Sequence, residues 1–219
     1  MLGLPPQPSK TSARALICFD FDLTLTHEHI YHAVRQMIAQ GARRDHACLR
    51  AAQLLERVGA RGGEELWDTL YALLAAGHGL AVTSFTCFPE LPMTLLSHGV
   101  RHLRARGAPR ELTSWLSRPV VVYGDPAPEL RPPFKLAGAH LAAVPAARFE
   151  EVGKRAHMEI ALERAREERG FSAERLILVD DDERNTELAR AAGHEAVAVS
   201  PNISHNEHLA ALRALLGLT

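Results

Sequence analysis

The sequence of 219 residues is 47% hydrophobic and 23% charged, with 25 Lys and Arg side chains against 26 Asp and Glu. This is the composition of an ordinary globular protein, and it excludes collagen-like, coiled-coil and disordered classes. The formal net charge of −1 provides no large basic field, so neither nucleic acid nor a membrane is a favoured partner.

The N-terminal segment and the cysteines bear on the cellular compartment. Residues 1–14 contain Pro and Ser but no basic region followed by an apolar run, so we expect a loose tail there. No stretch approaches the roughly 18 apolar residues of a membrane span. Cys18, Cys48 and Cys87 lack CxxC spacing and cannot all pair, which favours free thiols in a reducing compartment. We therefore expect a cytoplasmic protein.

Apolar runs and helical patterns alternate along the chain. Short apolar runs that end in polar residues indicate buried parallel strands, whereas apolar residues at intervals of three and four indicate amphipathic helices. Residues 126–145 contain five prolines and are predicted to form a loop. In chain order we predict strands over 15–19, 80–82, 119–123, 176–179 and 196–199, and helices over 28–40, 45–58, 64–76, 91–106, 150–169, 183–192 and 207–216.

This alternation predicts an α/β fold, a Rossmann-like parallel sheet sandwiched by helices. In open sheets of this kind, ligands bind outside the carboxyl ends of the strands. The polar residues expected there are Asp20 and Asp22 after the first strand, Thr83 and Ser84 after the second, and residues 180–182 after the fourth. Three separate strands should therefore deliver polar side chains to one site.

Residues 20–26 read D-F-D-L-T-L-T directly after the first predicted strand. This segment matches the signature D-x-D-x-T and resembles the phosphatases of the haloacid dehalogenase (HAD) superfamily. The resemblance implies that Asp20 is a nucleophile that forms an aspartyl-phosphate, and that Asp22 acts as general acid and base. It also disfavours carbon–halogen cleavage, because the dehalogenases of the superfamily lack the second aspartate.

Two further features are expected from the resemblance. Residues 153–157 read G-K-R-A-H, which is similar to a G-K-x-x-H segment of several HAD branches and implies that Lys154 neutralises the phosphoryl group. Lys135 is the alternative lysine. The resemblance also implies a hydroxyl after the second strand that holds the phosphoryl oxygens. Thr83 fits this role, with Ser84 as its competitor.

Residues 177–185 read I-L-V-D-D-D-E-R-N and are similar to the D-D-x-x-x-N segment of the same superfamily. The resemblance is greatest to its small magnesium-dependent phosphatases. It implies a metal ligand at Asp180 or Asp181, with the register of the three aspartates open by one residue, and a role for Asn185 in orienting the lysine or a water. Mg2+ prefers oxygen ligands. The candidate ligands are Asp20, Asp22, Asp180 and Asp181, and the candidate substrate contacts are Thr24, Ser84 and Asn185.

The segment of about 27–61 lies outside the resemblance, and we interpret it as a small helical cap inserted into a core over 15–219. Caps of this kind exclude water and contact the substrate, so its residues are the expected specificity determinants. We interpret His27, His29 and His32 as polar residues beside the site, and substrate contact suits them better than a transition-metal centre.

The expected function is magnesium-dependent hydrolysis of a phosphomonoester, with a phosphorylated small molecule or a phosphoprotein as substrate. Phosphoryl transfer to a second substrate, as in mutases, uses the same core motifs and is the first alternative. A non-catalytic binding module is the second alternative, and the complete set of motifs disfavours it.

Overall fold

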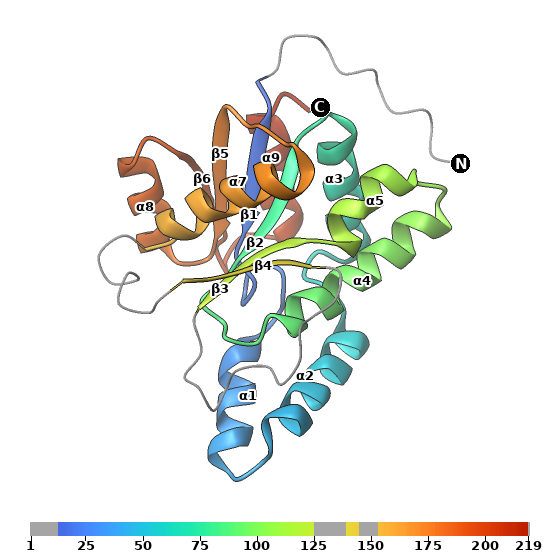
Figure 1. The fold of residues 1–219 in the computed structure, drawn as a ribbon, viewed down its shortest axis with the longest axis vertical. Coiled ribbons are helices and arrows are strands. Elements are labelled where there is room, and N and C mark those ends of the chain that lie inside the picture. The colour runs from blue at the N-terminus through green and yellow to red at the C-terminus, as the bar shows by residue number, and fades with distance from the viewer. Residues whose placement is uncertain (1–12, 125–138, 145–152, 219) are drawn as a thin grey trace.

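The computed structural model describes residues 13–124, 139–144 and 153–218, which form six strands and eight helices (Figure 1). The fold is α/β, as the sequence predicts. The strands are β1 (Ala15–Phe19), β2 (Gly79–Thr83), β3 (Val120–Gly124), β4 (His140–Val144), β5 (Arg175–Asp180) and β6 (Glu195–Ala198). The helices are α1 (Ile30–Ala39), α2 (Arg44–Val58), α3 (Gly63–Ala75), α4 (Glu90–Ala105), α5 (Arg110–Ser117), α7 (Arg155–Arg169), α8 (Glu183–Ala191) and α9 (His205–Leu215).

The strands form one parallel sheet in the order β4-β3-β2-β1-β5-β6. From β1 the chain moves outward through β2 and β3 to β4, and then returns to place β5 on the other side of β1. The strand order therefore reverses between β1 and β5. In Rossmann-like sheets this switch point is where a crevice for ligands opens at the carboxyl ends of the strands.

Helices cover both faces of the sheet, and the side chains of β1 alternate between them. Leu16 and Cys18 belong to the apolar cluster that α7 and α8 cover. Ile17 and Phe19 belong to the larger cluster on the opposite face, where α3, α4 and α9 pack. Because both faces are buried, all five residues of β1 are apolar, and the first polar side chain after them marks the carboxyl edge.

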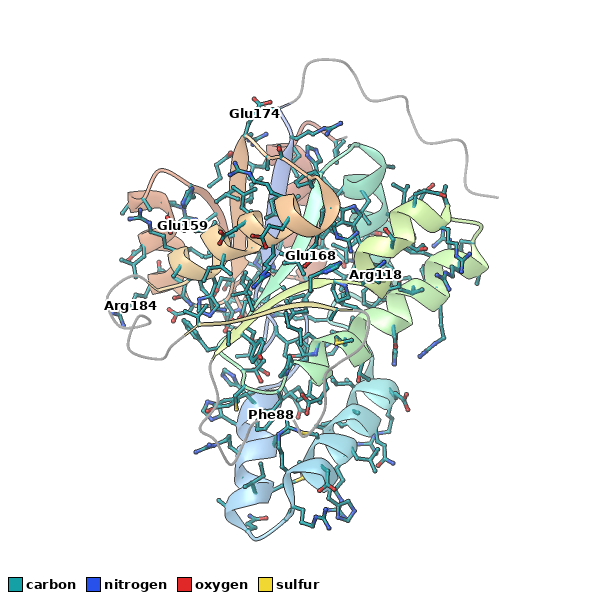
Figure 2. The ribbon with its side chains drawn as sticks, viewed as in Figure 1. Phe88, Arg118, Glu159, Glu168, Glu174 and Arg184 are labelled. Atoms are coloured by element: carbon teal, nitrogen blue, oxygen red, sulfur yellow. The ribbon has the colours of Figure 1, made fainter. Side chains whose placement is uncertain are left out.

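Helices α1 and α2 extend beyond the carboxyl end of β1 as a hairpin (Figure 1). Phe88, which is fully buried, lies where this hairpin meets the rest of the molecule (Figure 2). Its ring centroid is 6.0 Å from that of Tyr31 and 5.3 Å from the Arg44 guanidinium. Arg44 also pairs with Glu90 of α4 at 2.7 Å. The hairpin contains the helices of the predicted cap, and its action as a cap stays a prediction.

The structure differs from the sequence prediction at two elements. Strand β4 lies inside the segment predicted to be a loop, and that prediction is wrong for residues 140–144. This edge strand is mostly half-buried and has one β-branched residue, so its sequence carries a weak strand pattern. Helix α5 has only eight residues and was not predicted. Residues 1–12, 125–138 and 145–152, which include most of the predicted tail and Lys135, lie outside the described residues.

None of the helices in the described ranges is long and apolar enough to cross a membrane.

Candidate active site

The register of the sheet brings together polar residues that are far apart in the sequence. Phe19 of β1 is directly paired with Val179 of β5, so the next residues, Asp20 and Asp180, lie side by side at the switch point. The Asp20 amide donates to the Val179 carbonyl at 2.8 Å. On the other side of β1 the register brings Thr83 level with Asp20. Three strand ends thus meet at one place, as the sequence predicts.

Three carboxylates form a compact group there. Oxygens of Asp20, Asp180 and Asp181 lie within 4.8 Å of one another, and Asp20 and Asp180 are only 7% and 1% exposed. Burial raises the pKa of Asp20 well above its usual value, and the charge of Asp180 adds to this effect while Lys154 opposes it. Burial and Asp180 also raise the pKa of Asp181. Such a group of carboxylates can hold a metal ion.

Lys154 reaches this group from the N-terminal end of α7, and its side chain is 1% exposed. Its ammonium donates to the Asp20 carboxylate, donates to the Thr83 carbonyl at 2.5 Å, and lies 3.6 Å from Asp180. Burial opposes the charge on Lys154, but Asp20 and Asp180 outweigh it, so the pKa of the lysine is raised. The ammonium therefore stays charged beside the carboxylates.

Gly153 explains how the chain can bring the lysine so close. Its φ is +52°, and a Cβ atom here would lie 3.0 Å from the Asn185 side-chain oxygen. Glycine is therefore the residue that this approach requires. The Asn185 amide in turn donates to both oxygens of Asp180, at 3.2 and 3.3 Å. Asn185 borders the pocket, but its hydrogen bonds orient the Asp180 carboxylate.

The three consecutive aspartates have different partners. Asp182 is the N-cap of α8, where its carboxylate accepts a hydrogen bond from the Arg184 amide at 2.9 Å. The carboxylate group therefore uses Asp180 and Asp181. Thr24, expected to contact substrate, is fully buried, and its hydroxyl donates to Asp181 at 3.3 Å. It holds a candidate ligand in place.

Asp22 borders the same pocket, but its oxygens are not part of the compact group, and its role as a metal ligand stays a prediction. Its carboxylate accepts hydrogen bonds from the amides of Ile30 and Tyr31, at 2.6 and 3.2 Å, in the first turn of α1. Burial raises the pKa of Asp22, although these two amides oppose the shift. A raised pKa favours the protonated carboxyl that a general acid needs.

A strained turn places Asp22 on the same side as Asp20. Leu23 has a φ of 58° and is the only non-glycine residue of the described ranges in the left-handed region. This conformation costs about 1–2 kcal/mol. The Thr26 hydroxyl accepts from the Leu23 amide at 3.1 Å, and the Arg61 guanidinium donates to the Leu23 carbonyl. Arg61 lies just after the end of α2, so the segment that leaves the hairpin supports the turn.

The two candidate hydroxyls at the end of β2 are placed differently. The Thr83 hydroxyl is fully buried, and no described residue is its hydrogen-bond partner. Thr83 contacts the site through its carbonyl, which Lys154 uses. Ser84 borders the pocket, and its hydroxyl accepts from the Thr86 amide at 3.2 Å. Of the two hydroxyls, the geometry favours Ser84 as the one that meets a ligand.

A pocket of about 280 Å3 opens over the carboxylates. His29, Tyr31 and His32 of the hairpin form one wall, and Phe85 and Thr86 of the loop after β2 form another. The rings of His29 and His32 contact each other edge to face, with centroids 5.0 Å apart. The site thus combines an acidic floor with an aromatic and imidazole rim.

Sequence reasoning found the floor of the pocket and part of its rim. Of the three histidines that the sequence groups together, two border the pocket and His27 is not among its lining residues. Tyr31, Phe85 and Thr86 were missed. Tyr31 and Phe85 are not residue types that indicate phosphoryl chemistry. Thr86 has a hydroxyl, and its position just after the end of β2 could have pointed to it.

Comparisons with known proteins add no assignment, because no protein-family model matches this sequence and no curated protein matches it significantly. Membership of the HAD superfamily therefore remains a proposal. It rests on the motifs and on the positions that the fold gives to their residues.

Proposed function

We propose that the protein is a magnesium-dependent phosphomonoester hydrolase of the HAD superfamily with Asp20 as nucleophile. The observation that carries the proposal is the contact between Asp20 and Lys154 inside a group of three carboxylates, two of them buried and that of Asp181 partly exposed. A phosphoryl group is strongly anionic, so its transfer depends on positioning and on neutralising charge. The Lys154 ammonium supplies positive charge beside the nucleophile, and the two further carboxylates can position a cation that supplies more.

The donor set of the group fits Mg2+. Asp20, Asp180 and Asp181 offer only carboxylate oxygens, which suit a hard cation better than zinc or copper. The three carboxyl groups outnumber the single ammonium of Lys154, and a divalent cation would offset the negative charge of their ionised form. When bound, Mg2+ would neutralise phosphoryl oxygens and lower their repulsion of the nucleophile.

In the first step the Asp20 carboxylate attacks phosphorus, and the bond from phosphorus to the leaving oxygen breaks. Asp22 gives its proton to that oxygen. Lys154 balances the charge on Asp20 and on the phosphoryl oxygens, and the Ser84 hydroxyl donates to one of these oxygens. The products are the free alcohol and an aspartyl-phosphate on Asp20.

In the second step a water attacks the phosphorus of the aspartyl-phosphate. Asp22, now a carboxylate, takes a proton from this water. The bond from phosphorus to the Asp20 oxygen breaks, so phosphate leaves and the Asp20 carboxylate is restored. Asp22 ends the cycle protonated, as its raised pKa favours.

The substrate is a phosphorylated small molecule or a phosphorylated side chain of a protein. The pocket of about 280 Å3 has room for a phosphoryl group and a small leaving group. His29 and His32 border it from the hairpin, and their rings would contact the leaving group. Nucleic acid is disfavoured as substrate because the net charge of −1 gives no basic field.

The test is hydrolysis of p-nitrophenyl phosphate, with Mg2+ and with a chelator, by the native protein, Asp20→Asn and Asp45→Asn. Asp45→Asn is the matched control, since this exposed aspartate of α2 pairs with Arg43 and is not among the residues that line the pocket. We expect Mg2+-dependent turnover that Asp20→Asn abolishes and Asp45→Asn leaves unchanged. Turnover that persists in Asp20→Asn, or no turnover with any divalent ion or acceptor alcohol, would contradict the proposal.

A further inference from the structure

Phe85 is an aromatic side chain in an unusual place. It lies between Ser84 and Thr86 in the loop after β2, borders the acidic pocket and is 36% exposed. A large apolar ring at a polar site loses the stabilisation that burial would give it. A favourable contact between the ring and a nearby group would offset the stabilisation that is lost through exposure.

The nearby group is the ammonium of Lys154. The Lys154 nitrogen lies 4.5 Å from the centroid of the Phe85 ring, within the range of a cation–π interaction. The same nitrogen donates to Asp20 and to the Thr83 carbonyl. The ring thus covers the cation without offering a further hydrogen-bond acceptor that would compete with Asp20.

His157 fixes the ring from a second direction. It lies one turn after Lys154 on α7, and its ring meets the Phe85 ring edge to face with centroids 5.3 Å apart. His157 is fully buried. Burial, helped by the charge of Lys154, lowers the pKa of His157 to about 3, so this imidazole is neutral at physiological pH. The cation and the imidazole together give Phe85 a defined orientation.

We propose that Phe85 is a positioning residue that holds the Lys154 ammonium against Asp20. The kinetic consequence rests on the proposed function, whereas the contact itself does not. Without the ring, the ammonium would gain water and rotamer freedom, and it would spend less time at the nucleophile. Because the ring acts through Lys154, its loss should lower kcat more than it changes KM.

Two substitutions separate the ring from its bulk. Phe85→Leu keeps an apolar side chain at the pocket but removes the aromatic face, and Phe85→Tyr keeps the face. We expect Phe85→Leu to lower kcat for p-nitrophenyl phosphate roughly 3- to 30-fold, the range of a cation–π interaction at a partly desolvated site, with little change in KM. Phe85→Tyr should retain most of the native kcat.

A spectroscopic measurement tests the contact without any turnover. The sequence has only three lysines, so selective 13C labelling of lysine gives few side-chain signals, and Lys154→Met identifies the one that matters. Ring current from Phe85 should shift the terminal methylene signal of Lys154 upfield in the native protein and in Phe85→Tyr. In Phe85→Leu we expect this signal to move downfield.

The two readouts have separate meanings. A Lys154 signal that does not move in Phe85→Leu would overturn the positioning role, and so would an equal loss of kcat in Phe85→Leu and Phe85→Tyr. If the native protein has no phosphatase activity, the proposed function fails, but the lysine signal still decides whether Phe85 positions Lys154.

Discussion

The buried and outer halves of the candidate site are held in different ways. Asp20, Asp180 and Lys154 are almost inaccessible to solvent, and the paired ends of β1 and β5 and the start of α7 fix them. His29 and His32 are exposed and belong to the hairpin of α1 and α2. Sheet register cannot shift without moving side chains to the wrong face. The proposed chemistry would therefore depend on the sheet, and the proposed contacts with the leaving group on the position of the hairpin.

Asp22 connects the two halves. It follows β1 in the sequence, but its carboxylate is held by the amides of Ile30 and Tyr31 at the start of the hairpin. A movement of α1 would therefore change the position of the proposed acid and base while leaving Asp20 in place. We therefore expect substitutions in the buried half to lower kcat and substitutions in the hairpin to raise KM.

After the loss of the nucleophile itself, the largest effect is expected for Asp22→Asn with an alkyl phosphate as substrate. An alkoxide leaves poorly without a proton, so loss of the general acid should lower kcat roughly 10²- to 10⁴-fold. The loss should be smaller for p-nitrophenyl phosphate, whose leaving group departs as a stable anion. Steady-state kinetics with both substrates provide the measurement. The Asn side chain can still accept from the α1 amides, and equal losses on both substrates would contradict the assigned role.

Lys154→Met should lower kcat roughly 10²- to 10³-fold on both substrates alike, because it removes a cation from the transferring phosphoryl group in each case. The matched control is Arg155→Met. Arg155 is the next residue, and its half-exposed side chain pairs with Glu159 of the same helix. Thermal unfolding and kinetics on the three proteins measure the effect. An activity of Lys154→Met that equals the control would show that another cation has the role.

The hairpin should affect binding more than chemistry. The double substitution of His29 and His32 by Ala removes imidazoles from the rim, so we expect KM to rise roughly 2- to 10-fold for the preferred substrate with little change in kcat. His46→Ala, an exposed histidine of α2 outside the pocket lining, is the control. A fall in kcat with unchanged KM would place these histidines in the chemical step.

The sequence was informative where one chemical rule decides the structure. Buried parallel strands must be apolar, so a carboxylate directly after such a run marks a strand end, and this identified Asp20 and Asp180. The partner of Asp22 was hidden because it consists of backbone amides, which no sequence pattern displays. Phe85 was hidden for another reason. An apolar residue in a loop is usually read as packing, and only the nearby ammonium gives it a role.

The smallest predicted effect concerns stability in the absence of metal. The pKa of Asp20 is 3.8 without the fold and is raised in the folded protein, so the folded state holds its proton to a higher pH. Stability therefore falls as pH rises above about 3.8 and levels off once the raised pKa is passed. Asp20→Asn has no carboxyl group to ionise at this position, so its stability does not fall with pH for this reason. In a chelator at pH 7 we expect its Tm to exceed the native value by roughly 2–4 °C, the equivalent of about 1 kcal/mol for a chain of this length.

The same measurement at lower pH and with Mg2+ isolates the cause. Near pH 4 the native Asp20 is protonated, so the difference in Tm should shrink. With excess Mg2+ at pH 7 the order should reverse, because a cation that binds only the folded native protein stabilises it by mass action. A native protein that is the more stable of the two in chelator at pH 7 would mean that Lys154 already compensates the carboxylates. The carboxylates would then not require a divalent cation to offset their charge, and only the sequence motifs would support Mg2+ binding.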